Sequence, residues 1–340
     1  MKRITAIILL CGLLLCGCSS TAELPEEHVQ PTQPEPTKPY PEAEGEVSGD
    51  GVMTETAAAL GITYEDYPRI DGSTSTLGLV RAVWRAMVDE TSAAFGASYP
   101  EEAGKTVPSY HKLIDGEADL IFVPYASADV LQAAADAGVE LEFHKVAAEA
   151  LIFITPIENS AENITREQVR SIYLDNDINN WKELGGPRRK LVPICRNADS
   201  GSQSQMDNLI LDNQPMHRSI EKNHVELTME GMLEQVAYYH TGGFDGKKTR
   251  SYALGYTLYS YLINMTEMTG VGENLKILDY EGVAASRESI ADGSYPLADG
   301  YYAVVRSDLP EDHGARGIIQ WLQSEDGVAA IERIGLIPCA

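Results

Sequence analysis

Two loops rich in Ser, Thr and Gly lead into stretches with helical spacing. The first loop is residues 71–76, and apolar residues on one helical face follow it. The second, residues 196–202, lies between the apolar run 191–195 and a helical stretch that begins near Met206. A strand, a short loop and a helix in this order favour folds in which helices pack on a sheet. The first turn of such a helix has unpaired N–H groups, where an anion can bind.

The second loop has the residue types that oxyanion binding requires. Gly201 allows a close approach of the backbone, and Ser200 and Ser202 carry hydroxyl donors. Arg196 can present a planar fork of N–H groups to oxygens of the phosphate type. Ser and Thr are also preferred N-cap residues, so simple helix capping is the alternative interpretation of both loops.

The N-terminus indicates where the protein acts. Lys2 and Arg3 precede the apolar run 4–15, and the sequence Leu-Cys-Gly-Cys ends at Cys18. This pattern predicts a lipoprotein signal peptide over residues 1–17 with lipidation at Cys18. The run is shorter than the roughly 20 residues that a membrane-spanning helix needs. We therefore expect an extracytoplasmic protein anchored to the cell membrane, with an ordinary cleaved signal or a short anchor as the alternative.

Residues 18–56 form a Pro- and Glu-rich segment, which we interpret as a disordered tether. The folded part begins at about residue 57. The formal net charge of the chain is −25, which argues against nucleic acid as a partner.

Apolar runs alternate with helical patterns along the folded part, which indicates an α/β fold. Buried strands are expected at 120–123, 151–154, 191–194 and 301–305. Thr165 and Gln168 form a capping box, which predicts the start of a helix.

The sequence offers little support for catalysis, metal binding or a cofactor. No Gly-x-Ser-x-Gly motif occurs, and the histidines lack the spacing of a triad or a metal site. We therefore expect no enzymatic activity, no metal and no cofactor. Cys195 and Cys339 are the cysteines after Cys18, and the sequence leaves their pairing open. Cys195 is either a buried strand residue or a thiol whose pKa Arg196 lowers.

Several motifs together resemble the phosphate-binding, PstS-type subunits of bacterial ABC importers. The matching motifs are Ile172-Tyr173, residues 178–186, Arg196 followed by residues 200–202, and Gly255-Tyr256. The resemblance extends from about Tyr67 to Pro338 and is most specific between residues 172 and 202.

The resemblance implies a type II periplasmic-binding-protein fold with two α/β lobes joined by two crossovers. One lobe would comprise residues 57–150 and 286–340, and the other residues 151–285. The crossovers would lie near residues 150–156 and 280–301. The ligand would bind between the lobes, and hinge closure would present a surface to the membrane transporter.

The family's phosphate-contacting positions correspond to six residues in the two loops: Ser75, Thr76, Arg196, Ser200, Gly201 and Ser202. A third family loop, which usually reads Gly-Ser-Gly, is replaced by residues 104–108, which makes Thr106 a candidate.

One family feature is missing. The family has an aspartate shortly after the strand 119–123, and this chain has Pro124 and Tyr125 there. A carboxylate can accept a hydrogen bond from protonated phosphate but repels sulfate. Asp71, Asp199 or Tyr125 could take its place, and turn capping is the alternative role of both aspartates.

These inferences predict a monomeric lipoprotein that captures inorganic phosphate or a related oxyanion and delivers it to an ABC permease. The alternative is a tethered receptor or sensor of the same fold that binds a different small solute and is not coupled to phosphate uptake.

Overall fold

The computed structural model describes residues 52–242 and 246–339, which form a mixed α/β fold. The predicted signal peptide, the lipidation site Cys18 and most of the tether lie outside these residues. The folded part begins a few residues before the predicted boundary at residue 56. Val52 is buried, and Thr54 caps the first helix, because its hydroxyl accepts a hydrogen bond from the N–H of Ala57.

The α-helices of the described residues are α1 (Glu55–Ala59), α2 (Leu77–Met87), α3 (Ala93–Ala97), α4 (Thr106–Ile114), α5 (Ala128–Asp136), α6 (Arg166–Arg170), α7 (Gly201–Met206), α8 (Arg218–Asn223), α9 (Met229–Tyr238), α10 (Tyr259–Thr269), α11 (Arg287–Ala291), α12 (Gly314–Leu322) and α13 (Glu325–Arg333). The strands are β1 (Ile70–Gly72), β2 (Leu120–Pro124), β3 (Leu141–Pro156), β4 (Asn163–Ile164), β5 (Lys190–Pro193), β6 (Cys195–Arg196), β7 (Val225–Glu226), β8 (Ser251–Leu258), β9 (Leu275–Tyr280), β10 (Ala298–Arg306) and β11 (Ile337–Pro338).

The long strand β3 joins two regions of one mixed sheet. The main path of the sheet runs β1-β2-β10-β3-β8-β5, with β1 parallel to β2 and β8 parallel to β5. The first part of β3 pairs with β10, from Leu141 to Ala150. The second part, from Leu151 to Pro156, pairs with β8 and β9. The pairing partners of β3 therefore change between Ala150 and Leu151.

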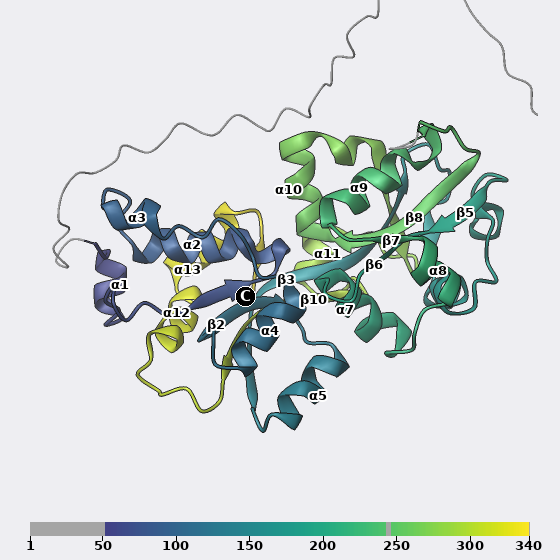
Figure 1. Cartoon of the computed structure of the whole chain (residues 1–340). Helices are drawn as coiled ribbons and strands as arrows, with labels where there is room; N and C mark the ends of the chain where they lie inside the picture. The colour runs from purple at the N-terminus through teal and green to yellow at the C-terminus, as the bar shows by residue number, and fades with distance from the viewer. Residues whose placement is uncertain (1–51, 243–245, 340) are drawn as a thin grey trace, which may run out of the picture. The chain divides into compact units, whose positions relative to one another are not determined.

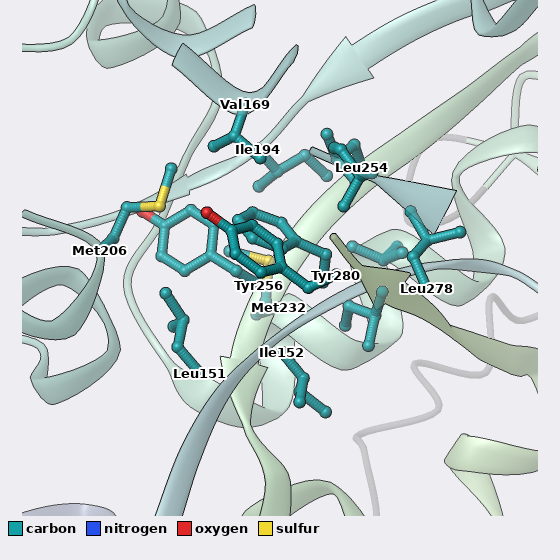
Figure 2. Close-up of a cluster of buried hydrophobic side chains, with 14 of the residues drawn as sticks. Leu151, Ile152, Val169, Ile194, Met206, Met232, Leu254, Tyr256, Leu278 and Tyr280 are labelled. Carbon is teal, nitrogen blue, oxygen red and sulfur yellow. The ribbon is translucent and has the colours of Figure 1, made fainter. Parts of the chain in front are cut away.

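The hydrophobic core is divided at the same place. One cluster draws mainly on residues 148–297, and two others draw mainly on residues 52–147 and 301–336. In Figure 1, α2, α12 and α13 lie beside the first region, and α9 and α10 lie beside the second. Figure 2 shows the larger cluster, to which β3 contributes Leu151 and Ile152, β8 contributes Tyr256 and α7 contributes Met206.

The predicted secondary structure is largely confirmed. Three predicted strands correspond to β2, β5 and β10, and the capping box at Thr165 and Gln168 begins α6. The predicted strand 151–154 is the last part of β3, which is 16 residues long. The helix predicted from Met206 is different, because α7 ends at Met206 and the π-helical turn η4, Asp207–Leu211, follows it.

None of the helices in the two described stretches is long and apolar enough to cross a lipid bilayer.

Candidate anion-binding site

A cavity of about 180 Å³ lies where four loops meet. It is lined by Ser73, Thr74 and Ser75 after β1, Lys105 and Thr106 at the start of α4, Arg196, Asn197, Asp199, Ser200 and Gly201 between β6 and α7, and Leu227, Thr228 and Met229 before α9. The two loops that the sequence singled out, although more than 100 residues apart, therefore face one space. Each of the four segments leads into a helix, and the first N–H groups of a helix can bind an anion.

Arg196 supplies the buried positive charge of the cavity. The residue is 7% exposed, and its backbone N–H donates to the Tyr256 hydroxyl at 2.9 Å. Its Nε donates to the carbonyl of Glu226 at 3.1 Å, and its Nη2 donates to the carbonyl of Leu227 at 3.3 Å. Burial lowers the pKa of the guanidinium, but an arginine keeps its charge in proteins.

The described part of the chain gives the guanidinium of Arg196 no direct ion pair, although the charge of Glu226 raises its pKa. Within residues 52–242 and 246–339, it forms no ion pair with a carboxylate, and its Nη1 donates to no protein acceptor. A buried charge without a partner is costly, and an anion in the cavity would compensate it.

Hydroxyl groups line the cavity on two sides. Ser73 and Ser75 share a hydrogen bond between their Oγ atoms at 2.9 Å, and Ser200 and Ser202 share one at 3.0 Å. Ser202 is fully buried behind Ser200 and does not line the cavity. The side chain of Ser200 does not cap α7, although Ser200 is the N-cap residue. Its hydroxyl hydrogen-bonds the hydroxyl of Ser202 instead of the helix backbone.

Gly201 brings two distant segments into contact. A Cβ atom at this position would lie 2.8 Å from Oγ1 of Thr106 and 2.7 Å from Cγ of Pro124. A larger residue would push the start of α7 away from the end of β2. Near this contact, the side-chain amide of Asn208 donates to the carbonyl of Ala126 at 3.0 Å.

Thr76 was predicted to contact the anion, but its hydroxyl is used within the fold. Thr76 is buried and does not line the cavity. Its Oγ1 donates to the carbonyl of Phe122 and accepts from the N–H of Ser73 at 2.9 Å. Thr76 thus fixes the loop to β2, which positions Ser75.

Asp71 and Tyr125, the suggested replacements for the family's aspartate, lie outside the cavity. Asp71 forms an ion pair with Lys112 at 2.6 Å and accepts from the N–H groups of Gly72 and Gly104. This is the capping role that the sequence left open. Tyr125 is 37% exposed, and its ring packs on Phe143 at 4.7 Å. The third suggested residue, Asp199, lines the cavity and is exposed to solvent.

The sequence did not single out Lys105 and Asn197, which also line the cavity. Lys105 precedes α4 with a φ of 71°, an uncommon conformation for a residue other than glycine. The Oδ1 atom of Asn197 is buried and has no hydrogen-bond partner in the described part of the chain. The available signal for Lys105 was its place in residues 104–108, which replace a glycine-rich loop of the family. Asn197 lies within the loop 196–202 that the sequence singled out, but its residue type did not mark it as an anion donor.

A second cavity of about 540 Å³ shares Arg196 and Asn197 with the first. It is more acidic, because Asp129, Asp207 and Glu221 line it. Burial, followed by repulsion from the other two carboxylates, raises the pKa of Asp207 to about 6.

Cys195 and Cys339 are free thiols in this structure. Cys195 is buried at the start of β6, as one of the two interpretations predicted, and burial raises the pKa of its thiol to about 12. The interpretation in which Arg196 lowers the pKa of this thiol is therefore wrong. Among the residues that the structure describes, no cluster of His, Cys, Asp or Glu side chains could hold a metal ion.

Comparison with known proteins identifies similar proteins over most of the chain. Residues 21–326 match the profile of the PBP superfamily domain. The phosphate-binding protein PstS of Borreliella burgdorferi is 29% identical over 193 residues, which cover 56% of this chain and 63% of that protein. The protein of the same name from Bacillus subtilis is 22% identical over 183 residues, which cover 54% of this chain and 52% of that protein. The aligned region thus spans less than two thirds of either relative.

Solved structures support the same fold. An ABC-type phosphate transport receptor from Vibrio cholerae matches with a TM-score of 0.57 and 20% identity, over 79% of this chain and 99% of that one. The structure of PstS from Borrelia burgdorferi matches with a TM-score of 0.50 and 21% identity, over 80% and 98% of the two chains. These similar proteins are named as binding proteins and receptors, which agrees with the prediction that the chain is not an enzyme.

Proposed function

The chain belongs to the PBP superfamily, and from this premise we propose that it binds inorganic phosphate or a related oxyanion in the cavity around Arg196. The observation that carries the proposal is the buried guanidinium of Arg196, which forms no direct ion pair among the described residues and faces hydroxyl groups of Ser75, Thr106 and Ser200. A tetrahedral anion can form hydrogen bonds with all of these groups. The names of the relatives point to the same ligand.

The proposal includes two lobes that close around the anion. The division of the hydrophobic core and the change of partners along β3 support two lobes that meet near residue 150. The lobes expected from the sequence are residues 57–150 plus 286–340 and residues 151–285, but Ile290, Tyr295 and Leu297 pack in the core cluster of the second lobe. Ser75 and Thr106 would then belong to one lobe, and Arg196, Ser200 and Gly201 to the other. The anion would link the lobes by accepting hydrogen bonds from both.

The proposal also covers the biological setting. The signal motif at the N-terminus supports lipidation at Cys18 and an extracytoplasmic location at the membrane. The relation to PstS proteins supports delivery of the anion to an ABC permease. The closed form would present the surface that the permease recognises, and the protein would act as a monomer.

Calorimetric titration of the full-length chain with inorganic phosphate tests the proposal. We expect Arg196→Ala to weaken phosphate binding by at least about 30-fold, equivalent to 2 kcal/mol, because it removes the charged donor from a desolvated site. Arg85→Ala is a control with the same change of net charge, since Arg85 is half exposed, pairs with Glu90 at 3.9 Å and lies over the ring of Tyr99 at 5.4 Å, outside the cavity. Equal phosphate affinity of the Arg196→Ala and Arg85→Ala variants would contradict the proposed site.

A further inference from the structure

The hydroxyl of Ser75 can face a bound anion either with its proton or with a lone pair. Ser75 lines the cavity and is half-buried. A serine hydroxyl carries one proton and two lone pairs, so it donates one hydrogen bond and accepts up to two. The hydrogen bonds within residues 73–76 decide which of these Ser75 offers to the cavity.

The hydroxyl of Thr76 sets the direction of these bonds. Its Oγ1 donates to the main-chain carbonyl of Phe122, and the carbonyl of Ser73 lies 3.1 Å from it. A carbonyl oxygen only accepts hydrogen bonds, so the single proton of Thr76 is used on these carbonyls. Toward any hydroxyl group, Thr76 can therefore only accept.

Ser73 donates to Thr76 for this reason. The Oγ atoms of the two residues are 3.0 Å apart, and the backbone N–H of Ser73 also donates to Thr76 Oγ1 at 2.9 Å. The proton of Ser73 is then used as well. Ser75, whose Oγ lies 2.9 Å from that of Ser73, must donate its own proton to Ser73. Ser73 is 2% exposed and Thr76 is fully buried, so solvent does not compete for these bonds.

The loop consequently presents lone pairs of Ser75 to the cavity, and no hydroxyl proton of Ser75 remains for a ligand. Ser200 in the other loop differs. Its hydroxyl bonds the hydroxyl of Ser202 at 3.0 Å, and either of the two can be the donor. When Ser202 donates, the proton of Ser200 is left for an anion. The two loops therefore offer opposite hydrogen-bonding groups to the same cavity.

We propose that Ser75 accepts the proton of a bound oxyanion and that Ser73 and Thr76 are positioning residues that hold it as an acceptor. Phosphate still carries a proton near neutral pH, and its P–O–H group can donate to Ser75. Sulfate carries none, so one of its oxygens would face a lone pair of Ser75 unless Ser75 gave up its bond to Ser73. The ligand class is thus a protonated tetrahedral oxyanion. This inference rests on the proposed anion site.

Calorimetric titration of the full-length chain with phosphate and with sulfate at neutral pH measures the preference. We expect the wild-type chain to bind phosphate about tenfold more tightly, the effect of one hydrogen bond of ordinary strength. Ser75→Ala should lose this factor for phosphate without weakening sulfate binding. A Ser75 that donated to both anions would weaken both equally when it is replaced. Arsenate, which is protonated near neutral pH, and selenate, which is not, should repeat the pattern.

Ser73→Ala tests the positioning. Without the hydroxyl of Ser73, the proton of Ser75 has no partner in the loop and can face an anion. We expect Ser73→Ala to strengthen sulfate binding about tenfold and to leave phosphate binding close to wild type, a gain that a purely structural role would not produce. Ser98→Ala is the control, since Ser98 shares a hydrogen bond with the Tyr64 hydroxyl at 2.9 Å and lies outside the cavity. If Ser73→Ala does not fold by circular dichroism, Ser75→Ala carries the test.

Three results overturn the inference and leave the proposed function standing. These are wild-type sulfate binding as tight as phosphate binding, equal losses of both affinities in Ser75→Ala, and an unchanged preference in folded Ser73→Ala. Asp199→Asn should keep the preference, although Asp199 is the carboxylate among the described residues that line the cavity. A preference lost in Asp199→Asn and kept in Ser75→Ala would assign the proton to Asp199 and overturn the inference too. Binding of neither phosphate nor sulfate by the wild-type chain overturns the inference and the proposed function together.

Discussion

Asp207 shows how a single residue at the edge of the site can lower the stability of the fold and still help to position Arg196. Its carboxylate accepts from the side-chain amide of Gln203 at 2.9 Å, and the carbonyl oxygen of that amide accepts from the hydroxyl of Tyr256. Tyr256 in turn accepts from the backbone N–H of Arg196. A chain of hydrogen bonds therefore connects Asp207 to the proposed anion-binding residue.

We predict that Asp207→Asn raises the melting temperature at about pH 8 by about 2 °C. The pKa of Asp207 is raised to about 6 in the folded protein, so the native state binds more protons than the unfolded state between the usual carboxyl pKa and this value. This contribution is present at low pH and is lost as the pH rises through about 6. Asparagine keeps the acceptor for Gln203 without the charge.

Thermal unfolding followed by circular dichroism at about pH 4 and about pH 8 measures this effect, with Asp175→Asn as a control at an exposed aspartate. A stabilisation by Asp207→Asn that is equally large at both pH values would contradict this explanation.

Ser75 and Thr76 show what a sequence can and cannot predict at the scale of one residue. Both are hydroxyl residues in the same loop, and both were predicted to contact the anion. Only Ser75 lines the cavity, whereas Thr76 bonds to the carbonyl of Phe122. Phe122 is 46 residues away along the chain, so this choice depends on tertiary packing that local pattern does not contain. Lys105 was not predicted to line the cavity for a similar reason. Its backbone has a positive φ, which the local sequence does not predict for a lysine.

At the scale of elements, the close contact between the start of α7 and the end of β2 is the feature most sensitive to a small change. We predict that Gly201→Ala weakens phosphate binding by about tenfold or more. The added methyl group would lie within 2.8 Å of Thr106 Oγ1 and Pro124 Cγ, and real Cβ atoms do not come so close. The two segments that present the donors would have to separate.

Gly96→Ala is the matched control for this prediction, since a Cβ atom at Gly96 of α3 would meet nothing within 4 Å. Calorimetric titration with phosphate compares the two variants. If Gly201→Ala and Gly96→Ala bind phosphate equally well, the contact at Gly201 is not important for the site.

The sequence predicted only part of strand β3. Its apolar end, residues 151–154, was predicted as a short buried strand, but the strand extends back to Leu141. The missed part contains Glu142, His144, Lys145 and Glu149 among apolar residues. Polar residues in this pattern reduce the apparent hydrophobicity, and only pairing with β10 along Leu141–Ala150 makes the segment a strand. The buried Glu149 in particular could not be expected in a central strand.

At the scale of the whole molecule, the motifs between residues 172 and 202 predicted more of the structure than hydrophobic periodicity and helix capping could. They indicated the family, and the family implied the fold class and a site formed by distant loops. The remaining uncertainty concerned the family's missing aspartate. In the described part of the chain, the one carboxylate that lines the smaller cavity is the exposed Asp199, so Arg196, Lys105 and the hydroxyl groups dominate that surface. An acidic protein can therefore present a locally basic site, because salt screens distant charges beyond about 8 Å.

The proposed closure predicts that the anion stabilises the whole fold rather than one lobe. Phosphate at 100 times its dissociation constant should increase the free energy of unfolding by about 2.7 kcal/mol, which corresponds to a rise of about 5 °C in melting temperature for a chain of this size. Differential scanning calorimetry of the full-length chain measures the shift, and Arg196→Ala should abolish it at the same phosphate concentration. Because the anion would contact both lobes, their unfolding should remain a single transition in the presence of phosphate. Two separate transitions, with phosphate shifting one alone, would mean that the anion binds within one lobe and does not hold the two together.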